Sequence, residues 1–199
     1  MPEKILNIAA GKFMPLDVKK PFFVVNVDTM FYLHDPPENV ERAAVRLNPI
    51  NSKSEMHNVN EDAFKFMERT IIPFDRVCIY RFLEHVSFTQ VEYFIYLVST
   101  VVRKGGIVDI IVPNYETLAE MILAEVPVDV NRNFHADNIL LTTELLNEPS
   151  CPHASIWTPA RAHYFWELER RFMIRQSDMV EHFEFDGRGL YLRFKAERL

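Results

Sequence analysis

Residues 4–13 read KILNIAAGKF, an apolar run that leads into Gly11. Residues 21–28 read PFFVVNVD and repeat the pattern, with an apolar run that ends on Asp28. Short runs of this kind are typical of strands that are buried on both faces of a parallel sheet. Ligands of open α/β sheets bind beyond the carboxyl ends of the strands, so a glycine and a carboxylate at these ends can line a ligand crevice.

Strand and helix patterns then alternate over the first 125 residues. Residues 91–102 place apolar side chains on one face of a helix, at Val91, Phe94, Ile95, Val98 and Val102. Thr89 and Glu92 predict a capping box at its start, and residues 103–105 predict its end. Further strands are predicted at residues 55–59, 74–80 and 106–113, and helices at 63–69 and 116–125. This alternation implies a mainly parallel sheet with helices on both faces.

The last forty residues follow a different pattern. Thr158 and Pro159 are typical of a helix start, and the helix is expected to run to about Arg171. Residues 179–198 alternate in character around Asp186 and Gly187, which is a β-hairpin signal. Without an internal repeat or a linker, residues 1–199 are expected to form a single domain. The predicted fold class is therefore a Rossmann-like, doubly wound α/β sheet, mainly parallel, with a C-terminal antiparallel β-hairpin.

Composition narrows the classes of function. The net charge is −6, which argues against binding of bulk nucleic acid. No apolar run reaches the roughly 18 residues that span a bilayer, and nothing near Met1 is typical of a signal peptide. With two cysteines, which cannot form a disulfide framework, the protein is expected in the cytoplasm. The absence of a GxxxxGK[ST] loop argues against ATP hydrolysis.

Several segments resemble a known family. They are similar, in their order along the chain, to the class I S-adenosylmethionine-dependent methyltransferases, and most of all to the compact, type 11-like group. The similar segments are ILNIAAGKFMPL (5–16), FFVVNVD (22–28), FDRVCIYRFLEHV (74–86), VVRKGGIVDIIVPN (101–114) and PHASIWTP (152–159). The resemblance runs over about residues 4 to 172. It implies a seven-stranded sheet, in which the terminal hairpin provides the sixth and seventh strands.

The resemblance also implies S-adenosylmethionine as cofactor. The residues expected to bind it are Asn7, Ala9, Ala10, Gly11, Asp28, Asp62, Ala63 and Arg81. By analogy, residues 9–11 would line the methionine end of the cofactor, and Asp28 would hold the ribose hydroxyls. Asp62 and the backbone of Ala63 would lie at the adenine. Residues 81–85 would face the sulfonium and the methyl acceptor.

Catalysis in this family aligns the acceptor with the methyl group for a backside displacement. A base is needed only where the acceptor loses a proton. His85 is the first candidate for that base and His153 the second. Cys151 and His153, even together with His85, fall short of a structural zinc set, so no metal site is predicted.

Structural explanations exist for the same residues. Gly11 fits a plain turn, Asp28 and Asp62 are both suited to cap helices, and Glu61 is an alternative to Asp62. Glu84 and His85 fit a solvated turn before a helix. Ala9 stands where the family pattern has its first glycine. If that position needs a positive φ, alanine costs about 1 kcal/mol there.

The sequence therefore predicts an S-adenosylmethionine-dependent methyltransferase. Its acceptor is unidentified, and the acidic charge favours a small molecule or a protein. The alternative is a methyltransferase-like subunit without activity, which would have protein partners in a larger assembly. Compact relatives occur in phage genomes, so the alternative includes a virion-associated role, by analogy alone.

Overall fold

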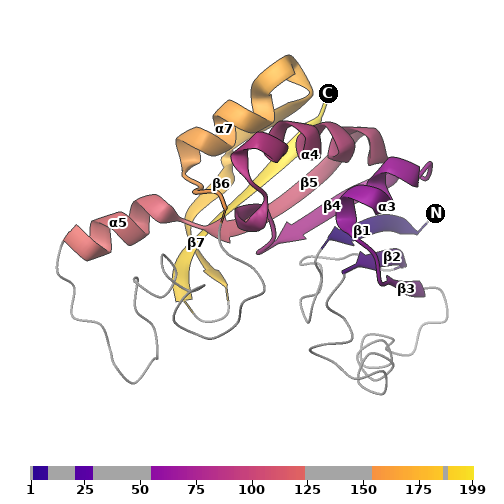
Figure 1. The fold of residues 1–199 in the computed structure, drawn as a ribbon, viewed down its shortest axis with the longest axis horizontal. Helices are drawn as coiled ribbons and strands as arrows, with labels where there is room; N and C mark the ends of the chain where they lie inside the picture. The colour runs from indigo at the N-terminus through magenta and orange to yellow at the C-terminus, as the bar shows by residue number, and fades with distance from the viewer. Residues whose placement is uncertain (1, 9–20, 29–54, 124–153, 186–187) are drawn as a thin grey trace.

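The computed structural model describes residues 2–8, 21–28, 55–123, 154–185 and 188–199. Within these ranges the chain forms a seven-stranded sheet in the order β3-β2-β1-β4-β5-β7-β6 (Figure 1). The strands are β1 (Glu3–Ile8), β2 (Phe22–Val27), β3 (Glu55–Val59), β4 (Phe74–Tyr80), β5 (Val102–Pro113), β6 (Phe172–Phe185) and β7 (Arg188–Arg198). The helices are α3 (Ala63–Arg69), α4 (Phe88–Val101), α5 (Tyr115–Leu123) and α7 (Pro159–Glu167), with short 3-10 turns η1 (Leu83–His85) and η3 (Leu168–Arg170).

Strand directions agree with the fold class expected from the sequence. The pairs among β3, β2, β1, β4 and β5 are all parallel. Strand β7 runs antiparallel to β5 and to β6, and Phe185 pairs with Arg188 at the tip of the hairpin. The predicted mainly parallel sheet with a C-terminal antiparallel hairpin is thus confirmed. Strand β6 begins at Phe172, seven residues before the predicted Met179, and shifts register along β7 to accommodate this length.

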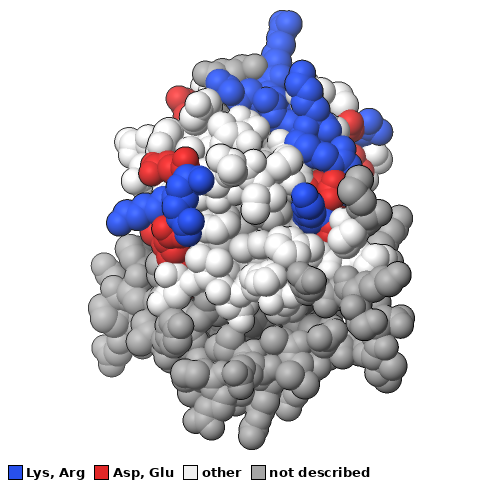
Figure 2. Space-filling model, turned by 90° about the vertical axis from the view of Figure 1, so that its right-hand side faces the viewer, with Lys and Arg blue, Asp and Glu red and all other residues white. Residues whose placement is uncertain are grey.

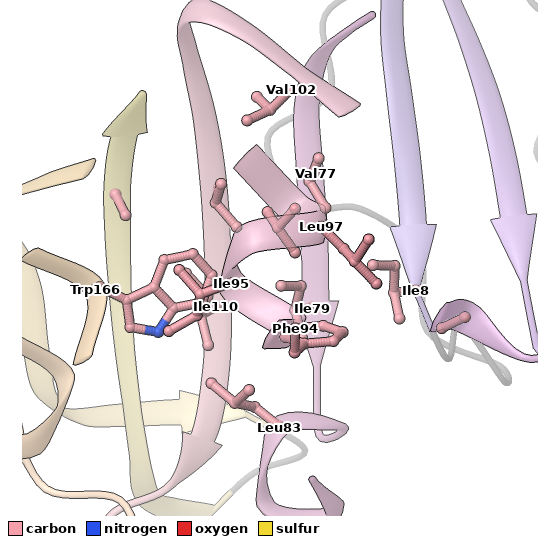
Figure 3. Close-up of a cluster of buried hydrophobic side chains, with 14 of the residues drawn as sticks. Ile8, Val77, Ile79, Leu83, Phe94, Ile95, Leu97, Val102, Ile110 and Trp166 are labelled. Carbon is pink, nitrogen blue, oxygen red and sulfur yellow. The ribbon is translucent and has the colours of Figure 1, made fainter. Parts of the chain in front are cut away.

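One face of the sheet carries the larger hydrophobic core. Helices α3, α4 and α7 lie over this face (Figure 1), and their apolar side chains pack on alternate strand residues. Phe94 and Ile95 of α4 meet Ile79 of β4 and Ile110 of β5 (Figure 3). All four are buried, and each such side chain contributes roughly 1.5–3 kcal/mol by leaving water. This core explains why residues 91–102 have helical periodicity.

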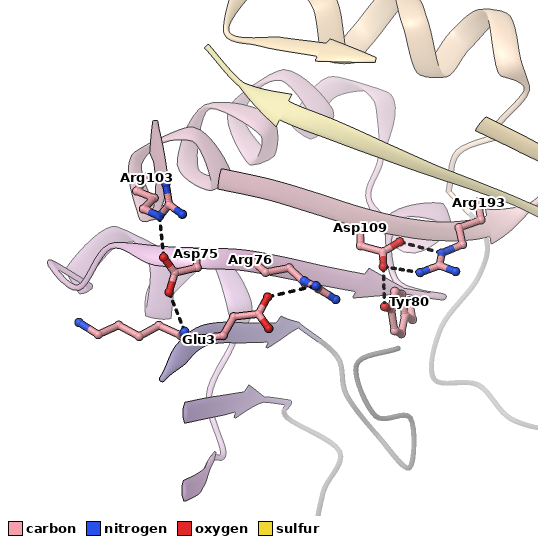
Figure 4. A network of polar contacts seen from close by, with 8 residues as sticks. Glu3, Asp75, Arg76, Tyr80, Arg103, Asp109 and Arg193 are labelled. Carbon is pink, nitrogen blue, oxygen red and sulfur yellow. Dashed lines mark hydrogen bonds and ion pairs between the residues drawn. The ribbon is translucent and has the colours of Figure 1, made fainter. Parts of the chain in front are cut away.

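The opposite face combines a smaller apolar cluster with a buried polar network. Asp109 of β5 is fully buried and accepts hydrogen bonds from Arg193 of β7 at 2.7 and 3.0 Å (Figure 4). The Tyr80 hydroxyl of β4 donates to the same carboxylate at 3.0 Å. Burial, together with the charge of Asp109, raises the pKa of the Cys78 thiol to about 12. The network joins three adjacent strands, and the thiol stays protonated at neutral pH.

The ends of α4 differ from the prediction. Its N-cap is Ser87, whose hydroxyl donates to the Gln90 side chain at 3.0 Å, so the capping box predicted at Thr89 and Glu92 is wrong. The helix ends at Val101, and β5 begins at the next residue instead of at Gly106. Between these elements the chain turns sharply.

Two glycines make that turn possible. Gly105 has φ +68°, and a Cβ on Gly106 would lie 2.8 Å from the Arg103 carbonyl oxygen and 2.9 Å from that of Asp75. Residues 103–105 therefore continue into an irregular start of β5, where the pairing with β4 shifts register. The helix start predicted at Thr158 is confirmed, because the Thr158 side chain accepts a hydrogen bond from the Arg161 N–H at 3.3 Å.

Charged side chains on the side of the molecule shown in Figure 2 surround an uncharged middle, and basic groups lie next to acidic ones. Three ion pairs are Arg69 with Glu61, Arg103 with Asp75 and Arg76 with Glu3. Partly exposed pairs of this kind contribute at most about 1 kcal/mol each. Among the described helices, none has the length and apolar character to cross a membrane.

Candidate functional site

The carboxyl ends of three parallel strands lie together in the middle of the sheet. Ile8 at the end of β1 pairs with Val27 of β2 on one side and with Ile79 of β4 on the other. The residues that follow these strands therefore leave the same edge, which is where ligands of open α/β sheets bind. We call this region the carboxyl edge. Ala9, Ala10 and Gly11, which follow β1, lie outside the described residues.

Asp28 follows β2 directly at the carboxyl edge. Its side chain is largely buried, and its backbone N–H donates to the Val59 carbonyl oxygen at 3.1 Å. This hydrogen bond extends the pairing of β2 with β3 by one residue. Because Val27 pairs with Ile8, Asp28 lies beside the end of β1.

Asn7 lies one residue before the end of β1 and belongs to a row of amides across the sheet. Its side-chain amide donates to Asn26 of β2 at 3.0 Å, and the Asn26 amide donates to Asn58 of β3 at 2.8 Å. The three residues are also register partners. The row ties the three strands together beneath the carboxyl edge.

The structure distinguishes the two acids that follow β3. Asp62 is exposed and is the N-cap of α3, where its side chain accepts from the Lys65 N–H at 3.1 Å. Glu61 binds the Arg69 guanidinium, and this hydrogen bond lowers the pKa of the Glu61 carboxyl. Ala63 is the buried first residue of α3, whose N–H has no acceptor within the helix. Asp62 thus caps α3, which is the structural explanation proposed for it from the sequence.

Arg81 leaves β4 in an unusual backbone conformation. Its φ is +55°, which costs a non-glycine residue about 1 kcal/mol. The Arg81 N–H donates to the Ile111 carbonyl oxygen of β5 at 2.8 Å, and its exposed guanidinium lies 5.9 Å from the Tyr191 ring centroid. Strained backbone of this kind is concentrated at functional sites.

The expectation that Glu84 lies in a solvated turn is wrong. It lies in η1 and is 0% exposed, whereas the neighbouring His85 is half-buried. In the part of the chain described, neither carboxylate oxygen of Glu84 has a hydrogen-bond partner. Burial raises the pKa of this carboxyl to about 7, although its own N–H and the Arg81 charge act in the opposite direction.

Residues far away in sequence hold η1 in place. Ala154 and Ser155 donate their backbone N–H groups to the Glu84 carbonyl oxygen at 2.8 and 3.0 Å. The Ser155 hydroxyl and the Trp157 indole both donate to the Leu83 carbonyl oxygen. These residues belong to the PHASIWTP segment, which therefore supports the turn after β4. His153 lies outside the described residues.

Tyr115 is another buried residue near Glu84. It is buried at the start of α5, and its N–H donates to the Trp157 carbonyl oxygen at 3.1 Å. Burial and the Glu84 charge raise the pKa of the Tyr115 hydroxyl. From the sequence, Glu84 was included within residues 81–85 without its burial being predicted, and Tyr115 and Ser155 were given no role, because their burial depends on contacts between distant segments. Ser155 and Trp157 could have been noticed from the sequence, because they lie in the PHASIWTP segment that resembles the methyltransferase family.

A hollow of about 520 Å³ lies at the other end of the parallel strands, away from the carboxyl edge. It is lined by the amino ends of β1 and β4 and by the irregular start of β5, including Asp75 and Arg103. Asp75 already accepts hydrogen bonds from the Lys4 N–H and from Arg103 (Figure 4). This hollow is therefore separate from the carboxyl edge. Among the described residues, no three His, Cys, Asp or Glu side chains are grouped to hold a metal ion.

No protein-family model matches the chain, and no curated protein sequence is significantly similar to it. The three-dimensional structure, in contrast, is similar to those of many solved proteins, of which three are described.

The first is an S-adenosylmethionine-dependent methyltransferase from Methanosarcina mazei, with 16% identity, a TM-score of 0.61, and coverage of 100% of this chain and 93% of that protein. The second is a putative O-methyltransferase from Nostoc punctiforme, with 18% identity, a TM-score of 0.61, and coverage of 100% and 53%. The third is the N-methyltransferase NodS from Bradyrhizobium japonicum in complex with S-adenosyl-L-homocysteine, with 14% identity, a TM-score of 0.55, and coverage of 98% and 78%.

These similarities define the class of fold. The chain has the fold of the class I S-adenosylmethionine-dependent methyltransferases, as the sequence resemblance predicted. It spans nearly the whole Methanosarcina protein but only about half of the Nostoc protein. At identities below 20%, the similarity establishes the fold and leaves the activity to be argued from the site.

Proposed function

We propose that the protein is an S-adenosylmethionine-dependent methyltransferase. The observation that carries the proposal is the placement of Asp28, a largely buried residue directly after β2 whose backbone N–H donates to the Val59 carbonyl oxygen, beside the end of β1. A carboxylate at the end of the second strand accepts hydrogen bonds from the ribose hydroxyls of a nucleoside bound at the switch point of an α/β sheet. The fold and the site thus support the same class of ligand.

The described residues fit the proposed cofactor. Asp28 supplies the acceptor for the ribose, and the N–H of Ala63 at the start of α3 is available to the adenine side. The η1 turn that carries Glu84 and His85 lies at the end of β4, where the sulfonium would lie. Asn7, Arg81 and residues 9–11 complete the proposed binding set, with Asp62 acting through the cap of α3.

The proposed chemistry needs few groups from the protein. S-adenosylmethionine, when bound, supplies a methyl group that is attached to a positively charged sulfur. The protein aligns the acceptor with that group and excludes water. His85, half-buried beside the carboxyl edge, is the proposed proton acceptor where the substrate must lose a proton, and His153 is the second candidate. The proposed acceptor is a small molecule or a protein.

Calorimetry with S-adenosylmethionine and S-adenosylhomocysteine tests the proposal. We expect micromolar binding of both ligands to the intact protein and at least a tenfold loss for Asp28→Asn, which has the same shape without the charge. Asp178→Asn, in the distant strand β6, is the matched control and should bind like the wild type. Thermal unfolding of each variant shows whether it is folded.

If the folded wild-type protein binds neither ligand, the proposed enzyme is wrong. That result would favour the methyltransferase-like subunit without activity. Equal binding by Asp28→Asn and the wild type would remove Asp28 from the site.

A further inference from the structure

Glu84 is the buried charged group that the proposed function leaves unexplained. Its side chain is 0% exposed, and within the described residues neither Oε1 nor Oε2 has a hydrogen-bond partner. Native proteins rarely leave buried polar atoms unpaired, and a buried carboxylate is costly unless a positive charge lies near it. A glutamate at this position therefore lowers the stability of the fold, which suggests that its carboxyl group has a function.

The turn that carries Glu84 is held in place by hydrogen bonds. The backbone on both sides of its Cα is fixed, because the carbonyls of Leu83 and Glu84 accept hydrogen bonds from residues 154–157. The carboxyl group lies near the end of β4 and is not accessible to solvent. In such surroundings a charge acts over several ångströms without direct contact.

Among the described residues, the titratable and charged groups around Glu84 come from two parts of the chain. Arg81 and His85 belong to the connection that contains η1, and Tyr115 belongs to α5. Arg81 is exposed and lies over the Tyr191 ring, so solvent weakens its effect on the buried carboxyl. Burial outweighs it, and the pKa of Glu84 is raised to about 7. The carboxyl is therefore poised to lose its proton when a cation binds nearby.

We propose that Glu84 supplies the counter-charge for the sulfonium of S-adenosylmethionine and so favours the methylated cofactor over its product. The inference rests on the proposed function, because it takes the sulfonium to lie at the end of β4. S-adenosylmethionine carries a fixed positive charge on sulfur, whereas S-adenosylhomocysteine is a neutral thioether there. The negative charge of Glu84 therefore attracts the first ligand and gains nothing from the second.

The preference for S-adenosylmethionine should depend on whether the Glu84 carboxyl holds its proton. A cation that binds near Glu84 favours its ionised form, so S-adenosylmethionine should expel a proton that S-adenosylhomocysteine leaves in place. A tenfold weakening of proton binding at Glu84 would release about 0.4 proton per bound cofactor at pH 7. By linkage, the preference for S-adenosylmethionine should then grow roughly eightfold between pH 5.5 and 8.5.

Calorimetry tests this without knowledge of the methyl acceptor. Each ligand is titrated at pH 7 in phosphate, HEPES and imidazole, which differ in ionisation enthalpy, so the slope of the observed enthalpy gives the number of protons released. The wild type should release about 0.4 proton more with S-adenosylmethionine than with S-adenosylhomocysteine. Glu84→Gln should abolish this difference and flatten the pH dependence of the affinity ratio. Because the amino group of each ligand titrates in every variant alike, the variants are compared for the same ligand.

Two further variants keep the test decisive. Glu84→Met, which is apolar and similar in length, replaces Glu84→Gln if the amide variant does not fold. Glu92→Gln changes an exposed glutamate of α4 and should behave like the wild type. Equal proton release for both ligands in the wild type, or a difference that persists in Glu84→Gln, would overturn the inference while leaving the proposed cofactor in place. Binding of neither ligand would overturn the proposed function and the inference with it.

Discussion

The Ser155 hydroxyl donates to the Leu83 carbonyl oxygen at 2.9 Å and joins residues that are 72 positions apart. The Trp157 indole N–H donates to the same carbonyl at 3.3 Å and to the Ser155 oxygen at 2.8 Å. This small buried network fixes the turn after β4 to the segment before α7. It places Glu84 and His85 at the carboxyl edge.

Ser155→Ala should therefore lower the free energy of unfolding by about 1–2 kcal/mol, because one buried hydroxyl both donates and accepts. Urea unfolding measures the change. Ser177→Ala, at an exposed position of β6, is the control and should stay within about 0.5 kcal/mol of the wild type. An equal effect of both substitutions would show that the network does not stabilise the turn.

The stability of the protein should depend on the ionisation of Glu84. Its pKa is raised from 4.5 to about 7 by burial, so the folded state holds a proton that the unfolded state releases between these values. The stabilisation is complete below pH 4.5 and is lost as the pH rises through 7, by about 3 kcal/mol in total.

Glu84→Gln removes this contribution to the pH dependence. Between pH 4.5 and 7.5, the free energy of unfolding of the wild type should fall by about 3 kcal/mol relative to that of the variant. Chemical denaturation at several pH values measures both curves. Parallel curves would mean that Glu84 titrates alike in the folded and unfolded states.

Breaking the Asp109–Arg193 pair should be strongly destabilising. Arg193→Met leaves the fully buried Asp109 carboxylate with the Tyr80 hydroxyl as its remaining side-chain donor among those described here, at an expected cost of about 3–5 kcal/mol. The double variant Asp109→Leu/Arg193→Met should recover much of that loss, because no uncompensated charge is then buried. Guanidinium unfolding of the two single variants and the double variant gives the coupling energy. Additive losses would contradict this account.

The two glycines before β5 should respond differently to alanine. Gly105→Ala places a Cβ at an ordinary contact distance of 3.9 Å from the Arg103 side chain but keeps a positive φ, which costs about 1 kcal/mol. Gly106→Ala would bring a Cβ within 2.9 Å of two backbone carbonyl oxygens, so the strand must shift and the loss should exceed about 2 kcal/mol. Thermal unfolding compares the pair, and a smaller loss for Gly106→Ala would contradict the close packing.

Much of the fold could be predicted from local pattern. The bounds of α3 and β4 match the predicted ranges, because apolar runs and amphipathic patterns are visible directly in a sequence. The N-cap of α4 was misplaced by two residues, since Ser87 and Thr89 are both good caps and local sequence does not choose between them. Packing of Phe88 against Trp157 and Phe165 helps to decide the start of this helix.

The site was predictable in outline and not in detail. Parallel pairing brings the residues that follow the strands to a common edge, so the sequence alone could predict that Asp28 and residues 81–85 lie there. The burial of Glu84 was not, because it depends on residues 154–157 and on Tyr115, which the chain brings back from far along the sequence.

By itself, the sequence determined the alternation of strands and helices, the antiparallel hairpin and the residues at the carboxyl ends of the strands. The tertiary structure decided which of these residues are exposed, capped or buried. It made Asp62 a helix cap, Asn7 part of an amide row and Glu84 an unpaired buried acid. The physical reason is that periodicity and turn chemistry act between neighbours in sequence, whereas burial and pKa depend on which distant segments exclude water from a side chain.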